Sequence, residues 1–166
     1  MLSAAVYVRL SGQMITQDTL DFFATPTMAA VSSAAAGVPH FTRAFLVEAN
    51  VGTNSMAVYV PEGMCADLLS DLKSNNRLAL VVVDVTTFKS RQYKGLVTAT
   101  SAASAAENER VQTELQKTIP VMAGFFGPGA GDGWSRYNIV PAMRLTFEIQ
   151  DIFNQTPGPG TGGRIN

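Results

Sequence analysis

The most apolar run of the chain, Leu78–Val83, is only six residues long. A short run of this kind, rich in β-branched residues, is typical of a strand buried inside a sheet. A helix that spans a membrane would need about 20 apolar residues, and no run approaches that length. We therefore expect Leu78–Val83 to be a buried central strand and not part of a membrane-spanning helix. Five other segments have strand-like patterns: Met28–Ser33, His40–Glu48, Met56–Val60, Arg91–Thr100 and Ala142–Phe153.

The segment His40–Glu48 shows the strictest alternation of side chains. Its two rows are Phe41, Arg43, Phe45 and Val47 on one side and Thr42, Ala44, Leu46 and Glu48 on the other. Because successive side chains of a strand point to opposite faces, one row should face the core and the other should face outward. Arg43 lies in an otherwise apolar stretch, so its environment decides what this strand can do.

Three segments are predicted to be helical. The first begins at the N-cap residue Thr16 and stops before Pro26, which cannot continue a helix. The second is Ala66–Ser74, where leucines recur at helical spacing on one face. The third is Ser104–Lys117, which opens with a capping box formed by Ser104 and Glu107.

The remaining segments carry few structural signals. Residues 120–138 are predicted to be a loose, Gly-rich region, and residues 157–163 a low-complexity tail that packs no core.

Because the helices do not alternate one-for-one with the strands, a doubly wound α/β fold is disfavoured. We predict a mainly β protein, an antiparallel barrel of about six strands with short helical insertions, over residues 1–153, followed by a Gly/Pro-rich tail over 154–166.

Composition limits the partners of this chain. Its 166 residues fit one domain, and only 15% are charged, whereas about 25% is typical. Burying surface against a second copy would explain the low charge, so we expect a homodimer. The net charge is −1 and no basic run exists, which argues against nucleic-acid binding and against a polybasic membrane anchor. Residues 1–15 lack a signal-peptide pattern, so a cytoplasmic location is expected.

The residues that most often carry chemistry are scarce. With Cys65 and His40 as single examples of their types, no intrachain disulfide and no Cys- or His-rich metal site can form. Both are interpreted as structural residues, so we assign no catalytic residue and no metal ligand. The Gly-rich stretch 127–133 lacks the Lys of a phosphate-binding loop. Residues 158–163 match a dinucleotide fingerprint only formally, since no helix follows them.

Several polar and aromatic residues are candidates for ligand binding. Arg43 would either hold its guanidinium in water at a strand edge or bind a phosphate, to which its forked donors are suited. Arg91, Gln92 and Lys94 open an apolar strand. They would form either a solvated strand end or a polar rim for an anionic, planar ligand.

Aromatic residues cluster near the Gly-rich region. Trp134 and Tyr137 would form either a lid that stacks on a ring or a surface aromatic cluster. Phe125 and Phe126 are expected to plug the barrel or to lie in a dimer interface.

Taken in order, four motifs resemble those of the pyridoxamine 5'-phosphate oxidase-related family. They are Gly37-Val38-Pro39 with Arg43 four residues later, Tyr59-Val60-Pro61, the segment 72–80, and Arg91-Gln92-Tyr93-Lys94-Gly95 at a strand start. The agreement extends over about residues 16–100, and residues 153–160 also resemble the ending of small bacterial members.

The resemblance implies a split-barrel homodimer that holds FMN at the subunit interface. It implies that Arg43 binds the FMN phosphate and that the backbone around Ala44 and Phe45 forms one wall for the flavin ring. Tyr59 and Val60 would form another wall. Gln92 and Arg91 would reach the flavin from the second subunit, and the patterns above add Lys94 and Trp134 to the expected cofactor-binding residues.

Two departures from the family pattern narrow the expected function. The oxidases carry a basic pair in the segment that corresponds to residues 63–69, but here that segment has no Arg or Lys and contains Asp67. The C-terminal segment that grips pyridoxal phosphate is also missing. We therefore predict an FMN-dependent oxidoreductase with a small substrate, not a true pyridoxamine 5'-phosphate oxidase. The alternatives are a non-catalytic flavin-binding or flavin-sensing protein, or a split barrel that binds another planar, anionic ligand.

Overall fold

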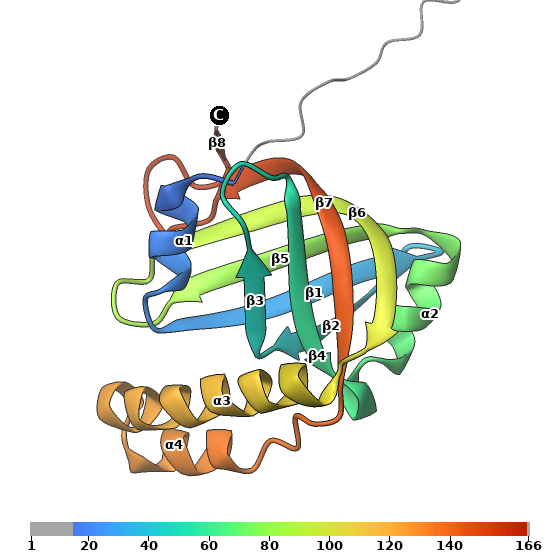
Figure 1. The fold of residues 1–166 in the computed structure, drawn as a ribbon. Coiled ribbons are helices and arrows are strands. Elements are labelled where there is room, and N and C mark those ends of the chain that lie inside the picture. The colour runs from blue at the N-terminus through green and yellow to red at the C-terminus, as the bar shows by residue number, and fades with distance from the viewer. Residues whose placement is uncertain (1–14, 166) are drawn as a thin grey trace, which may run out of the picture.

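The computed structural model describes residues 15–165, so nearly all of the N-terminal stretch considered above for a signal peptide lies outside the described residues. Its framework is one antiparallel sheet of eight strands that curls into a barrel (Figure 1). The strands are β1 Thr27–Ala35, β2 Val38–Ala44, β3 Leu46–Ala49, β4 Ser55–Pro61, β5 Arg77–Asp84, β6 Ser90–Ala102, β7 Ala142–Asn154 and β8 Arg164–Ile165. The helices are α1 Gln17–Phe23, the 3₁₀ helix η1 Glu62–Met64, α2 Ala66–Ser74, α3 Ala105–Phe126 and α4 Pro128–Ser135.

A change of partner at Phe45 closes the barrel. The sheet order is β2-β1-β5-β6-β7-β4-β3, so β2 and β3, which are consecutive in the chain, lie at its two ends. The predicted strand His40–Glu48 is thus divided: residues up to Ala44 pair with β1, and residues from Leu46 pair with β4. If β2 and β3 are counted as one strand and the two-residue β8, which pairs only with β7, is left aside, the result is the six-stranded antiparallel split barrel that the sequence predicts. The prediction of one uninterrupted strand over His40–Glu48 was wrong, because the alternation of side chains does not reveal where a strand changes its hydrogen-bonding partner.

Alternating side chains fill the barrel. Leu78, Leu80 and Val82 of β5 are buried, as are Tyr93 of β6 and Phe147 of β7. On β2, Thr42 and Ala44 belong to the inner row, whereas Phe41 of the other row is 78% exposed. The row that contains Arg43 therefore lies on the outside of the barrel.

The helices cover the ends and one side of the barrel. In Figure 1, α1 and α2 lie at opposite sides of the sheet, and α3 with α4 forms a layer below it. The α2 bounds agree with the prediction. Val111 and Leu115 of α3 form a second core with Ala57 and Tyr59 of β4, outside the barrel interior. None of the helices within residues 15–165 is long and apolar enough to cross a membrane.

The C-terminal half departs from the sequence prediction at residues 120–138, and it contradicts one of the two places expected for Phe125 and Phe126. Residues 120–138 are not loose, because α3 continues through Pro120 and α4 follows. Burial of Met122 and the packing of Gly131 against Ala123 hold this region in helical form. Phe125 and Phe126 do not plug the barrel: they lie at the end of α3 and are about half exposed.

The Gly-rich tail also folds back. Asn154 donates its backbone N–H to the carbonyl of Gly163 at 2.8 Å, and β8 then pairs with β7. The tail is therefore structured, and Ile165 near its end packs against the barrel core.

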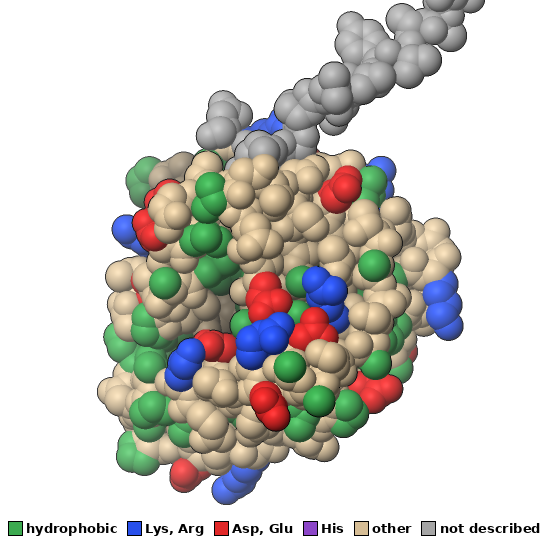
Figure 2. All heavy atoms as spheres, viewed as in Figure 1, with side chains coloured by type: hydrophobic (Ala, Val, Ile, Leu, Met, Phe, Trp, Pro, Cys, Tyr) green, Lys and Arg blue, Asp and Glu red, His purple; other side chains and the backbone are tan. Residues whose placement is uncertain are grey.

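A polar network fixes α3 to the strands. The Tyr59 hydroxyl lies 2.7 Å from Glu48 Oε2 and 2.9 Å from Glu107 Oε1. Arg110 donates to Glu48 at 2.9 Å, and Arg144 lies 3.5 Å from Glu107. Figure 2 shows acidic and basic side chains gathered on this face of the molecule. The network satisfies a buried phenol and joins β3, β4 and β7 to the first turns of α3.

The capping box at the start of α3 strengthens this attachment. Glu107 accepts from the Ser104 backbone N–H at 2.7 Å, while the Ser104 hydroxyl accepts from the Glu107 N–H at 3.3 Å. These two bonds to Ser104, followed by the Tyr59 hydroxyl, lower the pKa of Glu107 to about 2. Burial, followed by the hydrogen bonds to Glu48 and Glu107, raises the pKa of Tyr59.

The lowered pKa of Glu107 predicts how stability depends on pH. Because this pKa lies below the ordinary value of 4.5, Glu107 stabilises the fold above about pH 4.5, and this contribution is lost as the pH falls toward 2. We expect Glu107→Gln to lower the free energy of unfolding at pH 7 and to lower it progressively less toward pH 2. Urea unfolding at several pH values measures this difference. Glu109→Gln, an exposed site on the same helix, is the matched control, and a constant Glu107→Gln deficit across this range would contradict the assignment.

Gly95 is required by the close approach of β6 and β7. The pairing register shifts between Lys94 and Gly95, and a Cβ atom at Gly95 would lie 2.0 Å from the carbonyl oxygen of Glu148. We predict that Gly95→Ala lowers the free energy of unfolding by about 3 kcal/mol, because one strand must move away from the other. Gly63→Ala, where a Cβ meets no atom within 4 Å, should change it much less. Equal urea midpoints for the two variants would show that β6 tolerates a side chain here.

Candidate functional site

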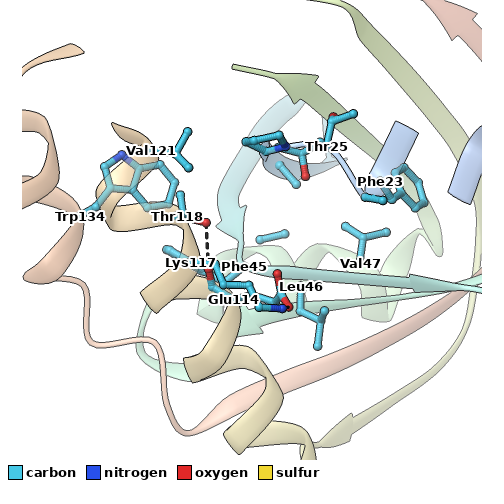
Figure 3. A pocket seen from close by; sticks show the side chains of 15 residues that line it. Phe23, Thr25, Phe45, Leu46, Val47, Glu114, Lys117, Thr118, Val121 and Trp134 are labelled. Atoms are coloured by element: carbon cyan, nitrogen blue, oxygen red, sulfur yellow. Dashed lines mark hydrogen bonds and ion pairs between the residues drawn. The ribbon is translucent and has the colours of Figure 1, made fainter. Parts of the chain in front are cut away.

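A cavity of about 530 Å³ opens where the barrel is split. Four parts of the chain line it: the segment from the end of α1 into β1, the junction of β2 with β3, residues 114–121 of α3, and Trp134 of α4. In Figure 3, Trp134 and Val121 lie on one side of the cavity, and Phe23 and Val47 lie on the other. The lining residues are Phe23, Ala24, Thr25, Pro26, Thr27, Ala29, Ala44, Phe45, Leu46, Val47, Glu114, Lys117, Thr118, Val121 and Trp134.

The change of strand partner at Phe45 creates this cavity. The pairing of β1 with β2 ends at Ala29 and Ala44, so Thr27 and Met28 at the start of β1 have no partner on that side. β3 pairs only with β4, so its other edge faces the gap. Two strand edges therefore diverge, and α3 crosses near them to form the third wall. A groove bounded by backbone edges and apolar side chains suits a flat ligand.

One wall of the site is an aromatic cluster. The ring of Phe45 lies 5.7 Å from that of Trp134 and 5.3 Å from that of Tyr137, and the Trp134 and Tyr137 rings are 5.6 Å apart. Trp134 comes from α4 and Tyr137 from the loop after it, so the two residues bring a Gly-rich segment against the strand junction. Trp134 is 8% exposed and lines the cavity, which makes the cluster part of the site and not a loose surface group.

Arg43 lies behind this wall. Its Nε donates to the Tyr137 hydroxyl at 3.1 Å, and its guanidinium carbon lies 5.2 Å from the centre of the Trp134 ring. Within residues 15–165 no carboxylate forms an ion pair with it. The Arg43 guanidinium thus contacts aromatic rings and one phenol oxygen. The sequence had suggested either a guanidinium in water or one bound to a phosphate, and this arrangement is a third. Its terminal nitrogens keep their capacity to donate to an anion.

The cavity contains one ion pair. Lys117 donates to Glu114 Oε1 at 2.5 Å, and the Thr118 hydroxyl donates to the backbone carbonyl of Glu114 at 2.8 Å. Both charged side chains are partly exposed, so water screens their attraction. The lining thus offers flat apolar surfaces, one movable cation and no nucleophile paired with a base.

Three of the residues expected to bind a cofactor line the cavity: Ala44, Phe45 and Trp134. Tyr59 and Val60 do not, because both are fully buried, Tyr59 under α3 and Val60 inside the barrel.

The strand-start residues lie elsewhere on the barrel. Arg91 donates to Asp18 at 2.7 Å and stacks over Phe22 at the α1 end. Gln92 accepts from Gln155 at 3.4 Å, and the ammonium of Lys94 lies 4.8 Å from the centre of the Phe153 ring. One chain therefore does not bring Arg91, Gln92 and Lys94 to the cavity.

The sequence did not reveal the contributions of α1–β1 and α3. Thr25, Glu114, Lys117 and Thr118 give no local signal of a site, although helical spacing places Glu114, Lys117 and Thr118 on one face. Knowing which face would meet the split requires the tertiary structure.

His40 has an acidic partner that lies far away in the sequence. Its Nδ1 lies 2.9 Å from Asp71 Oδ2, and Asp71 is 4% exposed. The hydrogen bond to Asp71 raises the pKa of His40. The pair joins β2 to α2, so His40 acts at the end of the barrel that α2 covers.

Comparison with known proteins supports a fold assignment. No protein-family model and no curated protein sequence matches the chain. Among solved structures, HupZ of Group A Streptococcus has a TM-score of 0.53 at 15% identity, over 90% of this chain and all of that one. A candidate pyridoxamine 5'-phosphate oxidase of Lactobacillus delbrueckii has a TM-score of 0.52 at 10% identity, over 87% and 97% of the two chains.

A third similar structure is a protein of Clostridium acetobutylicum related to general stress protein 26, described as of the pyridoxinephosphate oxidase family. It has a TM-score of 0.50 at 14% identity, over 84% of this chain and 87% of that one. These identities are too low to transfer a function, but the coverage is nearly complete. The chain therefore has the split-barrel fold of the pyridoxamine 5'-phosphate oxidase-related proteins.

Proposed function

We propose that the cavity at the barrel split binds FMN and that the protein is an FMN-dependent oxidoreductase acting on a small molecule. The supporting observation is the cavity itself: a split bounded by Ala44 and Phe45, walled by Trp134, with Lys117 inside and Arg43 behind the wall. Its volume of about 530 Å³ falls in the range of about 300–1,000 Å³ usual for small-molecule sites.

The residues that line the cavity offer more contacts for the flavin ring of FMN than for its phosphate. Phe45, Trp134 and Val47 offer apolar faces for a planar ring. Lys117 would hold the phosphate once the lysine leaves Glu114. Arg43 does not line the cavity, but its positive charge beside Trp134 would add electrostatic attraction for the phosphate. The bound flavin would supply hydride transfer. The chain's own residues would orient the ring and keep water from one of its faces, and no side-chain acid or base is required.

The proposal includes a homodimer. Arg91, Gln92 and Lys94 lie away from the cavity, so they would contact its ligand only from a second copy of the chain. Tyr59 and Val60 are buried, and we assign them no direct contact with the ligand. The cytoplasmic location stays a prediction from the sequence.

A second candidate is another planar, anionic ligand. Lys117 is already paired with Glu114, and residues 63–69, which carry no Arg or Lys, do not line the cavity. The loss of two charge-assisted hydrogen bonds, each contributing about 1.5–3 kcal/mol, would weaken phosphate binding strongly. A planar ligand with carboxylates in place of a phosphate, such as haem, would stack against the same walls, and its two separate carboxylates would not require one cluster of cations.

Trp134 allows a direct binding test, because it is the only tryptophan of the chain. We predict saturable quenching of its fluorescence by FMN. Lys117→Gln and Arg43→Gln should each weaken FMN binding by about tenfold, since each removes a charged donor worth about 1.5 kcal/mol. Riboflavin has no phosphate, so its affinity should be unchanged in both variants.

Lys73→Gln on α2 is the matched control for these variants. Equal loss of FMN and riboflavin affinity would place Lys117 and Arg43 outside the phosphate site. Saturable quenching by haem but not by FMN would favour the second candidate.

Turnover separates an enzyme from a passive flavin carrier. If the protein is an oxidoreductase, NADH or NADPH should bleach the flavin absorbance of the FMN-loaded protein faster than that of free FMN. An electron acceptor should then restore the colour. Stopped-flow absorbance measures both steps. Bleaching no faster than for free FMN with either donor would favour the flavin-binding or flavin-sensing alternative.

A further inference from the structure

A second cavity, of about 350 Å³, lies on the outer surface of the barrel. It shares no lining residue with the cavity at the split. Its floor consists of small residues, Ala34, Ala79 and Gly95, on three strands. Longer side chains surround this floor, so the surface of the sheet is hollowed there. We call this surface the β5–β6 hollow.

Two cations lie on the same face of this hollow. Ala79 pairs with Lys94 across β5 and β6, and Arg77 lies two residues before Ala79, so all three side chains point to the outer face. Arg77 and Lys94 are therefore diagonal neighbours on adjacent strands, a separation of about 7–8 Å that long side chains span readily. A group placed over Ala79 would lie beside Arg77, and Lys94 would reach it once its ammonium leaves the Phe153 ring.

Neither cation is neutralised. Within residues 15–165, no carboxylate lies within ion-pair distance of the Arg77 guanidinium or the Lys94 ammonium, and Lys94 rests against the Phe153 ring. The acidic residue of the hollow is Asp151, which pairs with Lys94 in the strand register. Its carboxylate instead accepts from Arg164 at 2.6 Å. The hollow thus has an excess of positive charge in a chain whose net charge is −1.

Polar side chains complete the lining. Ser32 pairs with Ala79 on the other side of β5, and the amide of Gln150 lies on β7. A hydroxyl donor, an amide donor, a forked guanidinium and an ammonium surround a floor without bulky groups. This donor set matches the several oxygens of a phosphate group, to which a guanidinium can donate two parallel hydrogen bonds.

We propose that the β5–β6 hollow binds the phosphate group of a small phosphorylated molecule, with Arg77 and Lys94 as its principal contacts. The volume of about 350 Å³ leaves room for a small organic part beside the phosphate. The hollow shares no lining residue with the cavity at the split. Arg77 has no part in the proposed flavin site, whereas Lys94 is also assigned to that site from a second copy of the chain.

The test is an NMR titration of the full chain with inorganic phosphate, against chloride at equal ionic strength. We expect saturable shifts of the backbone amides of Ser32, Ala79 and Gly95. Arg77→Gln and Lys94→Gln should each weaken phosphate binding by about tenfold. Glycerol phosphate should bind at the same amides, and acetate should bind more weakly, because it has fewer oxygens to accept from the donors.

Lys73→Gln is the control, since Lys73 is an exposed cation of α2 that does not line the hollow. The spectrum of each variant shows directly whether it remains folded. Shifts that do not saturate, or equal phosphate affinity in Arg77→Gln and the parent chain, would overturn the proposal. Acetate binding as tightly as phosphate would overturn the assignment to phosphate.

Quenching of Trp134 fluorescence by riboflavin separates the proposed flavin cavity from the proposed phosphate site in the β5–β6 hollow. Arg77→Gln should leave this quenching unchanged, because Arg77 is not part of the cavity at the split. Lys94→Gln is not used for this comparison, since Lys94 also belongs to the proposed dimeric flavin site. Loss of riboflavin quenching in Arg77→Gln would mean that the two surfaces are not independent, and it would overturn the β5–β6 hollow as a separate site.

Discussion

The change of hydrogen-bonding partner at Phe45 underlies the rest of the structure. A single strand could pair with both β1 and β4 along its whole length only if the two flanked it throughout, and here they diverge. Residues before Phe45 follow β1 and residues after it follow β4, with the Phe45 N–H donating to the Tyr59 carbonyl at 3.0 Å. The continuous chain of β2 and β3 therefore closes the barrel, but an opening remains between the start of β1 and the free edge of β3. The opening is the cavity, so the element that completes the core also creates the candidate site.

The third wall of that cavity depends on how α3 is attached. Glu107 caps the helix and also meets the Tyr59 hydroxyl, so one carboxylate both starts α3 and fixes it to β4. Glu114 and Lys117 follow about two to three turns later and reach the cavity. Removing the attachment would therefore disturb the position of the cavity's charged residues. Tyr59 belongs to this link, and the resemblance that placed it against a flavin had identified an important residue but not its contact.

The predictions that the structure confirms rest on features of the local sequence. Ala66–Ser74 was predicted with its observed bounds because leucine spacing and the asparagines after it are local features. The strand break at Phe45 and the helix through Pro120 were missed, since both depend on tertiary partners. Ala44, Phe45 and Trp134, which the sequence named, line the cavity, and their part in binding a cofactor stays a prediction. Lys117 and Thr25 also line it, but nothing near them in the sequence indicates which wall they face.

Arg43 shows how the aromatic wall and a bound ligand would interact. A guanidinium over an aromatic ring gains about 0.5–2 kcal/mol, more when water is excluded, and it retains its full charge. Trp134 therefore contacts Arg43 and also lines the cavity. A negatively charged ligand in the cavity would lie near an indole that already carries a cation. That arrangement favours negative charge in the cavity without an ion pair, and it explains why a positively charged residue can lie behind an aromatic wall with no acid beside it.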